Sequence, residues 1–412
     1  MRLHLAHGSP ALGDRGGTEL YADALVRAQR QTQDVQLLVP DRGGPTGLRR
    51  VDAHTWAVGV KPATRFRDTW SRPEVASAVA QLAPELIHAH HFAHLGLDAL
   101  AGVDCPIVLS LHDYHLLCVR GQLMDRRIEP CSGPQLEKCG ACVAEHLTLR
   151  PGMGILGRMS RRLGVHTLAK GLVAKAGPSA GGLVELEARM EAAERILVRA
   201  HLCLSPSRDL AQRIGKLSPT EAIEVLDLPL VAPLQPALPP GEGALRILYV
   251  GALIPSKGLH LLIEAADVLP GLELKVWGPA PVYDADPDYG QRCIQALGER
   301  YGGVFDAGQR QEILDLSDLL VVPSIWEENS PLVVREALAA GLRVVASDRG
   351  GIAEIDSRIR CFESGNVHGL VDLLRAEIAQ GRGRWTPRDF SMDRHLEALE
   401  QSYERARAAW LR

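Results

Sequence analysis

The sequence predicts an α/β protein of two domains, each built on a parallel sheet, that face each other across a cleft. Short apolar segments alternate with helical patterns in both halves of the chain, which is typical of βαβ units. A chain of 412 residues is also long for a single hydrophobic core. The proline-rich stretch PLVAPLQPALPPGEG, residues 229–243, separates the halves and suits an extended linker.

The expected elements follow from these apolar segments. Strands are predicted in the first half at residues 3–7, 35–39, 86–90 and 107–112, and in the second half at 244–250, 274–277, 318–322 and 343–346. The domains are then expected at residues 1–230 and 244–388, joined by a linker at 231–243. Residues 389–412 predict an amphipathic helix that packs back on the first domain, with one face formed by Leu396, Leu399, Tyr403, Ala406 and Trp410.

Composition excludes several classes of protein. The formal net charge of −4 gives no reason to expect nucleic acid as a partner. No apolar stretch approaches the roughly 18 residues of a membrane span, and the first residues lack the apolar core of a signal peptide. We therefore expect a soluble cytoplasmic enzyme.

Two glutamates eight residues apart, Glu328 and Glu336, flank the predicted start of a helix. Ser330 is expected to cap that helix, with Pro331 at its first position and Glu336 on its exposed first turns. Free backbone N–H groups at a helix start favour an anion such as a phosphate. Carboxylates accept hydrogen bonds from hydroxyl groups. The segment therefore predicts a site for a phosphate beside sugar or ribose hydroxyls.

The wider segment, PSIWEENSPLVVREALAAGLRVVASDRGGIAEI (residues 323–355), places a strand end, Asn-Ser-Pro-Leu, a helix and Gly-Gly-x-x-Glu in order. In this context the two glutamates resemble those of the glycosyltransferase family 4 enzymes. These are retaining, nucleotide-sugar-dependent transferases with two facing Rossmann-like domains, the GT-B architecture. The resemblance spans nearly the whole chain. It implies hexosyl transfer from a nucleotide diphosphate sugar to a hydroxyl of a glycan, a lipid-linked molecule or a small molecule.

The resemblance also implies roles for single residues. Glu328 and its loop would hold the donor sugar, Glu336 would bind the ribose, and Lys257 would reach the diphosphate, where a point charge stabilises a leaving group. His112 matches the family's histidine facing the reacting sugar. The expected catalytic residues are thus His112, Glu328 and Lys257. The expected donor-binding residues are Gly16, Gly17, Gly251, Lys257, Glu328, Asn329, Ser330, Pro331, Leu332, Val333 and Glu336.

One position departs from the family pattern. Ala252 stands where the family often has an arginine, so Lys257 and helix dipoles would have to suffice, or Arg335 or Arg349 would compensate. The stretch DADPD, residues 284–288, matches the letters of a metal-binding Asp-x-Asp pair. It lies in a proline-bearing loop and not at a strand end, so we expect catalysis without a divalent metal.

Four of the eight cysteines fall in an insertion at about residues 118–146. Two of them have the Cys-x2-Cys spacing that suits a tetrahedral ion. We expect a structural zinc there, while an iron–sulfur cluster or four reduced thiols use the same residues. The proposed ligands are Cys118, Cys131, Cys139 and Cys142.

A basic segment at residues 150–175 carries arginines and lysines interleaved with apolar residues. Three readings stay open for it: peripheral contact with the inner face of a membrane, a solvated helix face, or a basic wall for an anionic acceptor.

Other functions fit parts of the pattern. A sugar-nucleotide epimerase or phosphorylase shares the architecture, and a metal-stapled binding protein without catalysis fits the cysteines. A dinucleotide-dependent dehydrogenase is disfavoured because no Gly-x-Gly-x-x-Gly follows the first strand. Recognition of nucleic acid is disfavoured by the net charge and the few aromatic residues. The nucleobase, the sugar and the acceptor stay open.

Overall fold

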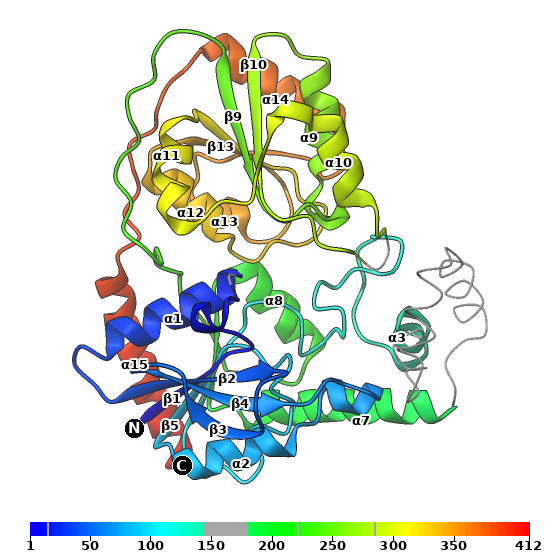
Figure 1. The fold of residues 1–412 in the computed structure, drawn as a ribbon, viewed down its shortest axis with the longest axis vertical. Coiled ribbons are helices and arrows are strands. Elements are labelled where there is room, and N and C mark those ends of the chain that lie inside the picture. The colour runs from blue at the N-terminus through cyan, green and yellow to red at the C-terminus, as the bar shows by residue number, and fades with distance from the viewer. Residues whose placement is uncertain (15, 144–179, 221, 284–285) are drawn as a thin grey trace.

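The computed structural model describes residues 1–14, 16–143, 180–220, 222–283 and 286–412, and it contains two sheets, one in each half of the chain (Figure 1). The first has the strand order β3-β4-β2-β1-β5-β6-β7-β8 and is parallel except for β3, which pairs with β4 in antiparallel fashion. Its strands are β1 (Arg2–Leu5), β2 (Val35–Arg42), β3 (Gly47–Arg50), β4 (Thr55–Val60), β5 (Leu86–Ala89), β6 (Ile107–Ser110), β7 (Leu202–Ser205) and β8 (Ile223–Val225).

The second sheet is parallel throughout, in the order β11-β10-β9-β12-β13-β14. Central strands β12 and β13 are buried along their whole length, as expected for a parallel sheet with both faces covered. The predicted α/β class with two parallel sheets is confirmed. The strands are β9 (Leu245–Val250), β10 (Leu272–Trp277), β11 (Tyr301–Gly303), β12 (Leu319–Val322), β13 (Arg343–Ser347) and β14 (Arg360–Phe362).

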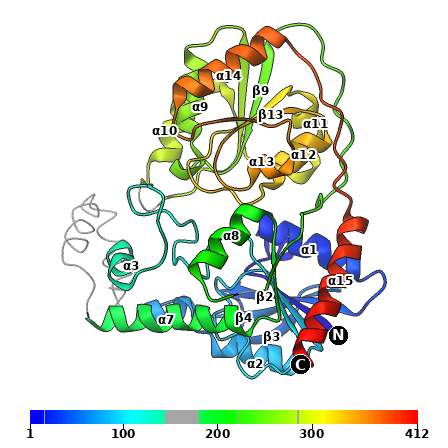
Figure 2. The ribbon, with the colours of Figure 1, turned by 180° about the vertical axis from the view of Figure 1, so that it is seen from behind.

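Helices cover both sheets (Figures 1 and 2). Around the first sheet, which we call the first unit, they are α1 (Gly17–Gln29), α2 (Pro73–Leu82), α3 (Leu136–Cys142), α7 (Ala180–Arg199) and α8 (Arg208–Leu217). The second unit has α9 (Leu259–Asp267), α10 (Tyr289–Leu297), α11 (Arg310–Asp315), α12 (Leu332–Ala339), α13 (Ile352–Ile355) and α14 (Val367–Gln380). Short 3-10 turns lie at Pro10–Leu12, Phe66–Thr69, Pro255–Lys257, Gly298–Arg300 and Ala307–Gln309. None of the helices in the described ranges is long and apolar enough to cross a membrane.

The last helix, α15 (Met392–Trp410), lies against the first unit, beside α1 in both views (Figures 1 and 2). Leu399, Tyr403 and Ala406 are fully buried there, in a cluster that includes residues of α1 and of strands β5, β6 and β7. Trp410, which we expected on the same face, is instead 39% exposed at the last turn. The chain therefore crosses between the units twice, once through the linker and once before α15.

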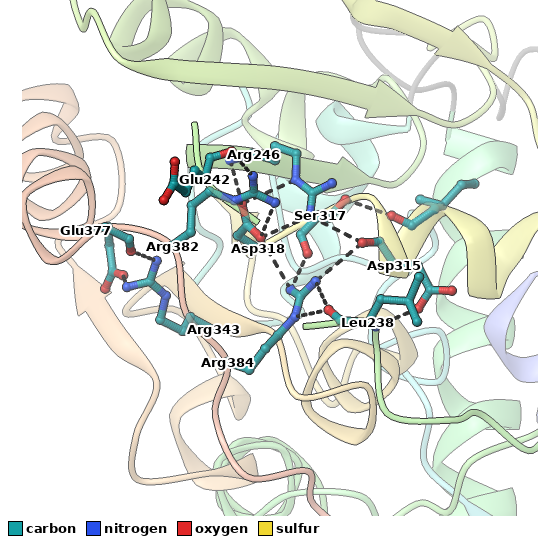
Figure 3. Close-up of polar contacts among 12 residues, drawn as sticks. Leu238, Glu242, Arg246, Asp315, Ser317, Asp318, Arg343, Glu377, Arg382 and Arg384 are labelled. Atoms are coloured by element: carbon teal, nitrogen blue, oxygen red, sulfur yellow. Dashed lines mark hydrogen bonds and ion pairs between the residues drawn. The ribbon is translucent and has the colours of Figure 1, made fainter. Parts of the chain in front are cut away.

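A buried ionic cluster anchors both crossings to the amino-terminal edge of the second sheet (Figure 3). Asp318, fully buried just before β12, accepts hydrogen bonds from Arg246 of β9 and from Arg382. Arg382 also donates to the backbone of Glu242, and Arg384 donates to the backbone of Leu238. Burial alone would raise the pKa of Asp318, but the arginine hydrogen bonds outweigh it and lower that pKa. This edge is opposite the carboxyl ends of the strands.

Candidate active site

A lysine–glutamate pair lies at the carboxyl ends of the central strands of the second unit. Lys257 Nζ is 2.6 Å from Glu328 Oε1, and Ser324 Oγ donates to the same oxygen at 2.5 Å. Lys257 also lies 4.9 Å from the centre of the Trp326 ring. Ligands of open α/β sheets bind at this edge. The pair therefore holds a positive charge where an anionic ligand would arrive.

The helix that follows Glu328 begins one residue later than we predicted. Leu332 is its first residue and Pro331 is the N-cap, so the predicted capping role of Ser330 is wrong. Ser330 Oγ instead accepts a hydrogen bond from Arg335 at 2.6 Å, and no side chain caps the helix. The first N–H groups of α12, at Leu332 and Val333, therefore have no side-chain cap and are available to an anion.

The start of α1 in the first unit approaches this helix start. Gly16 is the N-cap of α1, and it too provides no side-chain cap. A Cβ atom added at Gly17 would lie 3.6 Å from Leu332 Cδ1, so the two units touch here. The starts of α1 and α12 thus lie at the junction of the units, but the carboxylate of Glu19 lies over the start of α1, with its Oε2 2.4 Å from where a Cβ atom at Gly16 would be. Gly251, in contrast, uses its N–H to bond the backbone of Trp277.

Glu336 is buried, which corrects the expectation of an exposed position on α12. Burial raises the pKa of its carboxyl to about 7, although Arg310 opposes the shift. Arg310 Nε lies 3.3 Å from Glu336 Oε1 without forming a hydrogen bond. The carboxylate is therefore short of partners, which hydroxyl groups of a ligand could supply. No motif in the sequence identifies Arg310.

His112 lies two residues beyond β6, at the junction with the second unit. Asn329 Nδ2 donates to its backbone oxygen at 2.7 Å. His112 Nε2 is 3.3 Å from His90 Nδ1, and His90 Nε2 is 2.8 Å from His4 Nδ1, which makes a chain of rings. Burial lowers the pKa of His112 to about 4, despite the opposing charge of Asp113. The imidazole is therefore neutral at pH 7 and offers hydrogen bonds without carrying a charge.

The carboxylates nearest to His112 already have partners. Asp113 Oδ2 lies 3.1 Å from His91 Nε2, and Glu19 Oε1 lies 3.0 Å from His7 Nε2. Burial alone would raise the pKa of Asp113, but the charges and hydrogen bonds of His91 and His115 lower it well below its ordinary value. Together with Glu328, these are held groups and not free nucleophiles.

The Gly-Gly-x-x-Glu part of the segment docks the second unit on the first, a role that sequence reasoning missed. Glu354 accepts hydrogen bonds from the backbone N–H groups of Arg208 and Asp209, at 2.7 and 2.8 Å, and so caps α8. Gly350 has φ of 68°, and a Cβ atom there would lie 2.1 Å from Glu328 O. Glycine at this position therefore lets the loop approach Glu328 closely. The Ser207-Arg208-Asp209 helix start in the sequence is a signal for such a contact.

The arginines considered as substitutes for the family residue at Ala252 are already engaged. Arg335 is fully buried and bonds Asp227 as well as Ser330, so it is not available to a ligand. Arg349 Nη1 lies 3.4 Å from Glu327 Oε1, and Arg213 of the first unit lies 3.1 Å from the other oxygen of Glu327. The start of α12 and Lys257, whose side chain is 25% exposed and whose ammonium is shared with Glu328, are therefore the donors best placed for a diphosphate.

The four predicted metal ligands, Cys118, Cys131, Cys139 and Cys142, line one cavity of about 230 Å³ beside α3. Burial raises the pKa of the Cys139 and Cys142 thiols. Within the described ranges, the side chains that lie close enough together to share a metal ion are instead His4, His88 and His90, whose ligand atoms all lie within 4.8 Å of one another. The four thiols thus share one cavity, but the structure does not show their sulfur atoms gathered around one point, and the zinc site stays a prediction.

Two further expectations concern segments that the structure covers in part or not at all. The basic segment at 150–175 lies outside the described residues. In the stretch at 284–288, residues 284 and 285 lie outside them too, while Asp286 forms an ion pair with Arg292.

Two family models match the chain on either side of the linker. Residues 15–144 match the model described as "Glycosyltransferase Family 4", and residues 234–376 match "Glycosyl transferases group 1". The chain belongs to the family 4 glycosyltransferases. The second match covers Lys257, Glu328 and Glu336, and the first covers His112, so the family regions meet at the site described above.

Curated relatives of this family 4 chain match it over part of its length. It is 34% identical over 130 residues to lipopolysaccharide 1,2-N-acetylglucosaminetransferase of Salmonella typhimurium, across 27% of this chain and 32% of that protein. It is 32% identical over 178 residues to D-inositol 3-phosphate glycosyltransferase of Mycobacterium bovis, across 39% and 37%. The matched segment thus spans about a third of the length of these relatives.

Solved structures agree with the GT-B architecture over the whole chain. Sucrose-phosphate synthase from Thermosynechococcus elongatus has a TM-score of 0.66 at 15% identity, covering 99% of both chains. Anabaena Alr3699/HepE in complex with UDP and glucose has a TM-score of 0.61 at 16% identity, covering 98% of this chain and 99% of that one. At these identities the likeness establishes the fold.

Proposed function

We propose that the protein is a retaining glycosyltransferase that moves a hexose from a nucleotide diphosphate sugar to an acceptor hydroxyl. The observation that carries this proposal is the meeting of the Lys257–Glu328 pair with His112 at the junction of the units, bridged by Asn329. Family membership and the GT-B architecture support it. The complex of Alr3699/HepE with UDP and glucose makes UDP the first nucleotide to test.

In the proposed reaction, the uncapped start of α12 and the Lys257 ammonium bind the diphosphate, and Gly16 and Gly17 let the backbone of the first unit approach it. As the bond to the sugar breaks, negative charge grows on the leaving phosphate, and preorganised dipoles and a fixed cation stabilise it. These groups supply the charge that a divalent ion would otherwise supply, so we propose metal-independent catalysis. Glu328 would hold sugar hydroxyls, and Glu336 would hold those of the ribose.

We propose retention because the family 4 enzymes that the chain resembles are retaining transferases. The described carboxylates beside His112 are held by partners, which favours direct attack by the acceptor over a covalent glycosyl-enzyme intermediate. The acceptor hydroxyl would then attack the anomeric carbon from the face that the leaving group departs from, and its proton would pass to the departing phosphate oxygen, which leaves as the nucleoside diphosphate. Neutral His112 would bind a sugar hydroxyl. Contact of the two units would exclude water, which would hydrolyse the donor.

We also propose that Cys118, Cys131, Cys139 and Cys142 hold a structural zinc, since four thiols line one cavity in a loop that has little regular structure apart from α3. When bound, zinc would crosslink this loop. Elemental analysis is expected to find about one zinc per chain. Its absence from protein purified without chelator would refute the proposal. Peripheral membrane contact through residues 150–175 and a cytoplasmic location stay predictions.

Product analysis tests the main proposal. The protein is incubated with nucleotide sugars and a panel of acceptors, and NMR determines the products and the configuration of the new bond. A glycoside with the configuration of the donor is expected. An inverted product would refute retention. A changed sugar on the same nucleotide, or a sugar phosphate, would instead identify an epimerase or a phosphorylase.

A further inference from the structure

A second cavity, of about 690 Å³, lies beside the candidate active site at the carboxyl edge of the first sheet. Its walls come from the ends of β2 and β4, the loops after β5 and β6, and helix α7, while Val282 and Tyr283 close it from the second unit. In Figure 1 the loop after β6 rises to the second unit near the start of α10. A cavity of this size holds a small molecule.

The lining of this cavity is strongly basic. Arg42, Lys61, Arg72, Arg120 and Arg189 contribute to it, and among the described lining residues there is no aspartate or glutamate. Arg42 forms an ion pair with Asp14 at 2.8 Å, and Arg72 has Glu74 at 3.8 Å.

The remaining three cations, Lys61, Arg120 and Arg189, have no carboxylate within 4.0 Å in the described part of the chain. Their charges are therefore balanced neither by an ion pair nor by an acidic lining. An anionic ligand would supply the missing partner.

Arg189 shows how costly this arrangement is without an anion. The residue is only 2% exposed, and its Nη2 donates to the backbone oxygen of His115 at 2.6 Å. Burial lowers the pKa of its guanidinium to about 10. Burial and the charge of Arg42 lower the pKa of His94, another lining residue, to about 4. Buried cations that lack an anion are destabilising, and a phosphate accepts paired hydrogen bonds from arginine.

The cavity lies next to the proposed reaction centre. His115 lines it, and the His115 ring lies 4.5 Å from that of His91, whose Nε2 is 3.1 Å from Asp113. Asp113 directly follows His112. On the other side, Tyr283 OH donates to Gln122 Oε1 at 3.3 Å and lies 3.5 Å from Arg120 Nη2. A ligand held here therefore lies between the two units, next to the proposed catalytic histidine.

We propose that this cavity binds an acceptor that carries a phosphate group, with Lys61, Arg120 and Arg189 as its ligands. The inference rests on the proposed transferase function, since it assigns the second substrate of that reaction. The phosphate belongs either to a soluble sugar phosphate or to a lipid headgroup. Both sources present negatively charged phosphate oxygens to the cations. Lys61 is exposed and Arg120 half-buried, so a neutral acceptor would chiefly leave the buried charge of Arg189 without a direct anionic partner in the described part of the chain.

Calorimetric titration of the full chain with three soluble probes tests the proposal: inorganic phosphate, glucose 6-phosphate and glucose. The phosphate-bearing probes are expected to bind at least about tenfold more tightly than glucose. This difference in affinity corresponds to one hydrogen bond to a charged group. Lys61→Gln and Arg120→Gln are each expected to weaken them by about tenfold. Lys61→Arg should restore binding. Arg65→Gln is the control. It removes an equal charge from an exposed residue outside the cavity lining and should leave the affinity for the phosphate-bearing probes unchanged.

Vesicles of phosphatidylglycerol and of phosphatidylcholine distinguish the two sources. Binding to phosphatidylglycerol vesicles that Lys61→Gln weakens, without binding of glucose 6-phosphate, assigns a lipid-borne phosphate. Binding of glucose 6-phosphate assigns a soluble one. If none of the phosphate-bearing probes binds, or if Arg65→Gln weakens them as much as Lys61→Gln and Arg120→Gln do, the proposal is wrong. Titration of wild-type protein with UDP, GDP and ADP in parallel tests the donor site independently. Loss of nucleotide binding and loss of phosphate-acceptor binding can then be distinguished.

Discussion

Replacing Glu336 by glutamine is predicted to stabilise the folded protein above pH 7. The structure raises the pKa of this buried carboxyl from 4.5 to about 7, so the folded state holds a proton that the unfolded state releases between those values. The contribution of the protonated carboxyl to the free energy of unfolding is therefore fully present below pH 4.5. It is lost as the pH rises to about 7. At about 1.4 kcal/mol per pH unit, ionising the buried group costs about 3 kcal/mol at pH 8. Glutamine resembles the protonated acid and avoids that cost.

Urea unfolding, followed by tryptophan fluorescence, measures this difference at pH 5.5 and at pH 8. The variant should exceed wild type by about 3 kcal/mol at pH 8 and by only about 1 kcal/mol at pH 5.5. Glu264→Gln, at an exposed position in the same unit, should show neither effect. If Glu336→Gln were less stable than wild type at pH 8, Arg310 would hold the carboxylate ionised and the reasoning from burial would be wrong.

The same carboxyl links nucleotide affinity to pH. Ribose hydroxyls donate to the ionised form, so binding should release a proton below about pH 7, and affinity should rise as the pH increases through that value. Calorimetry in buffers of different ionisation enthalpy detects the proton, and Glu336→Gln should abolish the release. An affinity independent of pH between 6 and 8 in wild type would remove the ribose assignment.

Three further predictions concern other parts of the molecule. Lys257→Ala should lower the transfer rate at saturating donor by about 10²- to 10³-fold. The control Lys275→Ala, at an exposed position on β10, should leave the rate unchanged. Equal rates for the two variants would show that the Lys257 charge is not used. Asp318→Asn leaves three arginines short of a buried anion and should cost about 3 to 5 kcal/mol in urea unfolding. Asp267→Asn, at a largely exposed ion pair, should stay within about 0.5 kcal/mol, and a comparable loss there would show that the cluster in Figure 3 has no special weight. The double change Cys139→Ser and Cys142→Ser should lower both the zinc content and the unfolding temperature, and an unchanged zinc content would exclude these ligands.

The sequence predicted those parts of the molecule that depend on local pattern. Strand β12 and the Pro-rich linker could be found because β-branched residues and prolines restrict the backbone locally. The start of α12 was predicted one residue early, because Ser330 is a good N-cap by composition but bonds Arg335 in the fold. Strands β3, β4, β7, β8, β11 and β14 were missed. All but the six-residue β4 have only three or four residues and so carry little local pattern.

Contacts between distant segments could not be predicted. The burial of Glu336, its neighbour Arg310 and the capping of α8 by Glu354 depend on residues that meet only after both units have folded and docked. The basic cavity is of the same kind, because its cations come from β2, the loops after β4 and β6, and α7. No spacing in the sequence marks such a set, although each residue type is common at anion sites.

The central claim is that Lys257 and the uncapped start of α12 bind the diphosphate of a nucleotide sugar. Calorimetric titration of wild type and Lys257→Ala with UDP, GDP and ADP, and with the matching monophosphates, tests it most directly. We predict that one diphosphate binds wild type more tightly than its monophosphate does, and that this difference disappears in Lys257→Ala. If none of the diphosphates binds, or if the variant keeps the full preference, the donor site does not lie where the account places it.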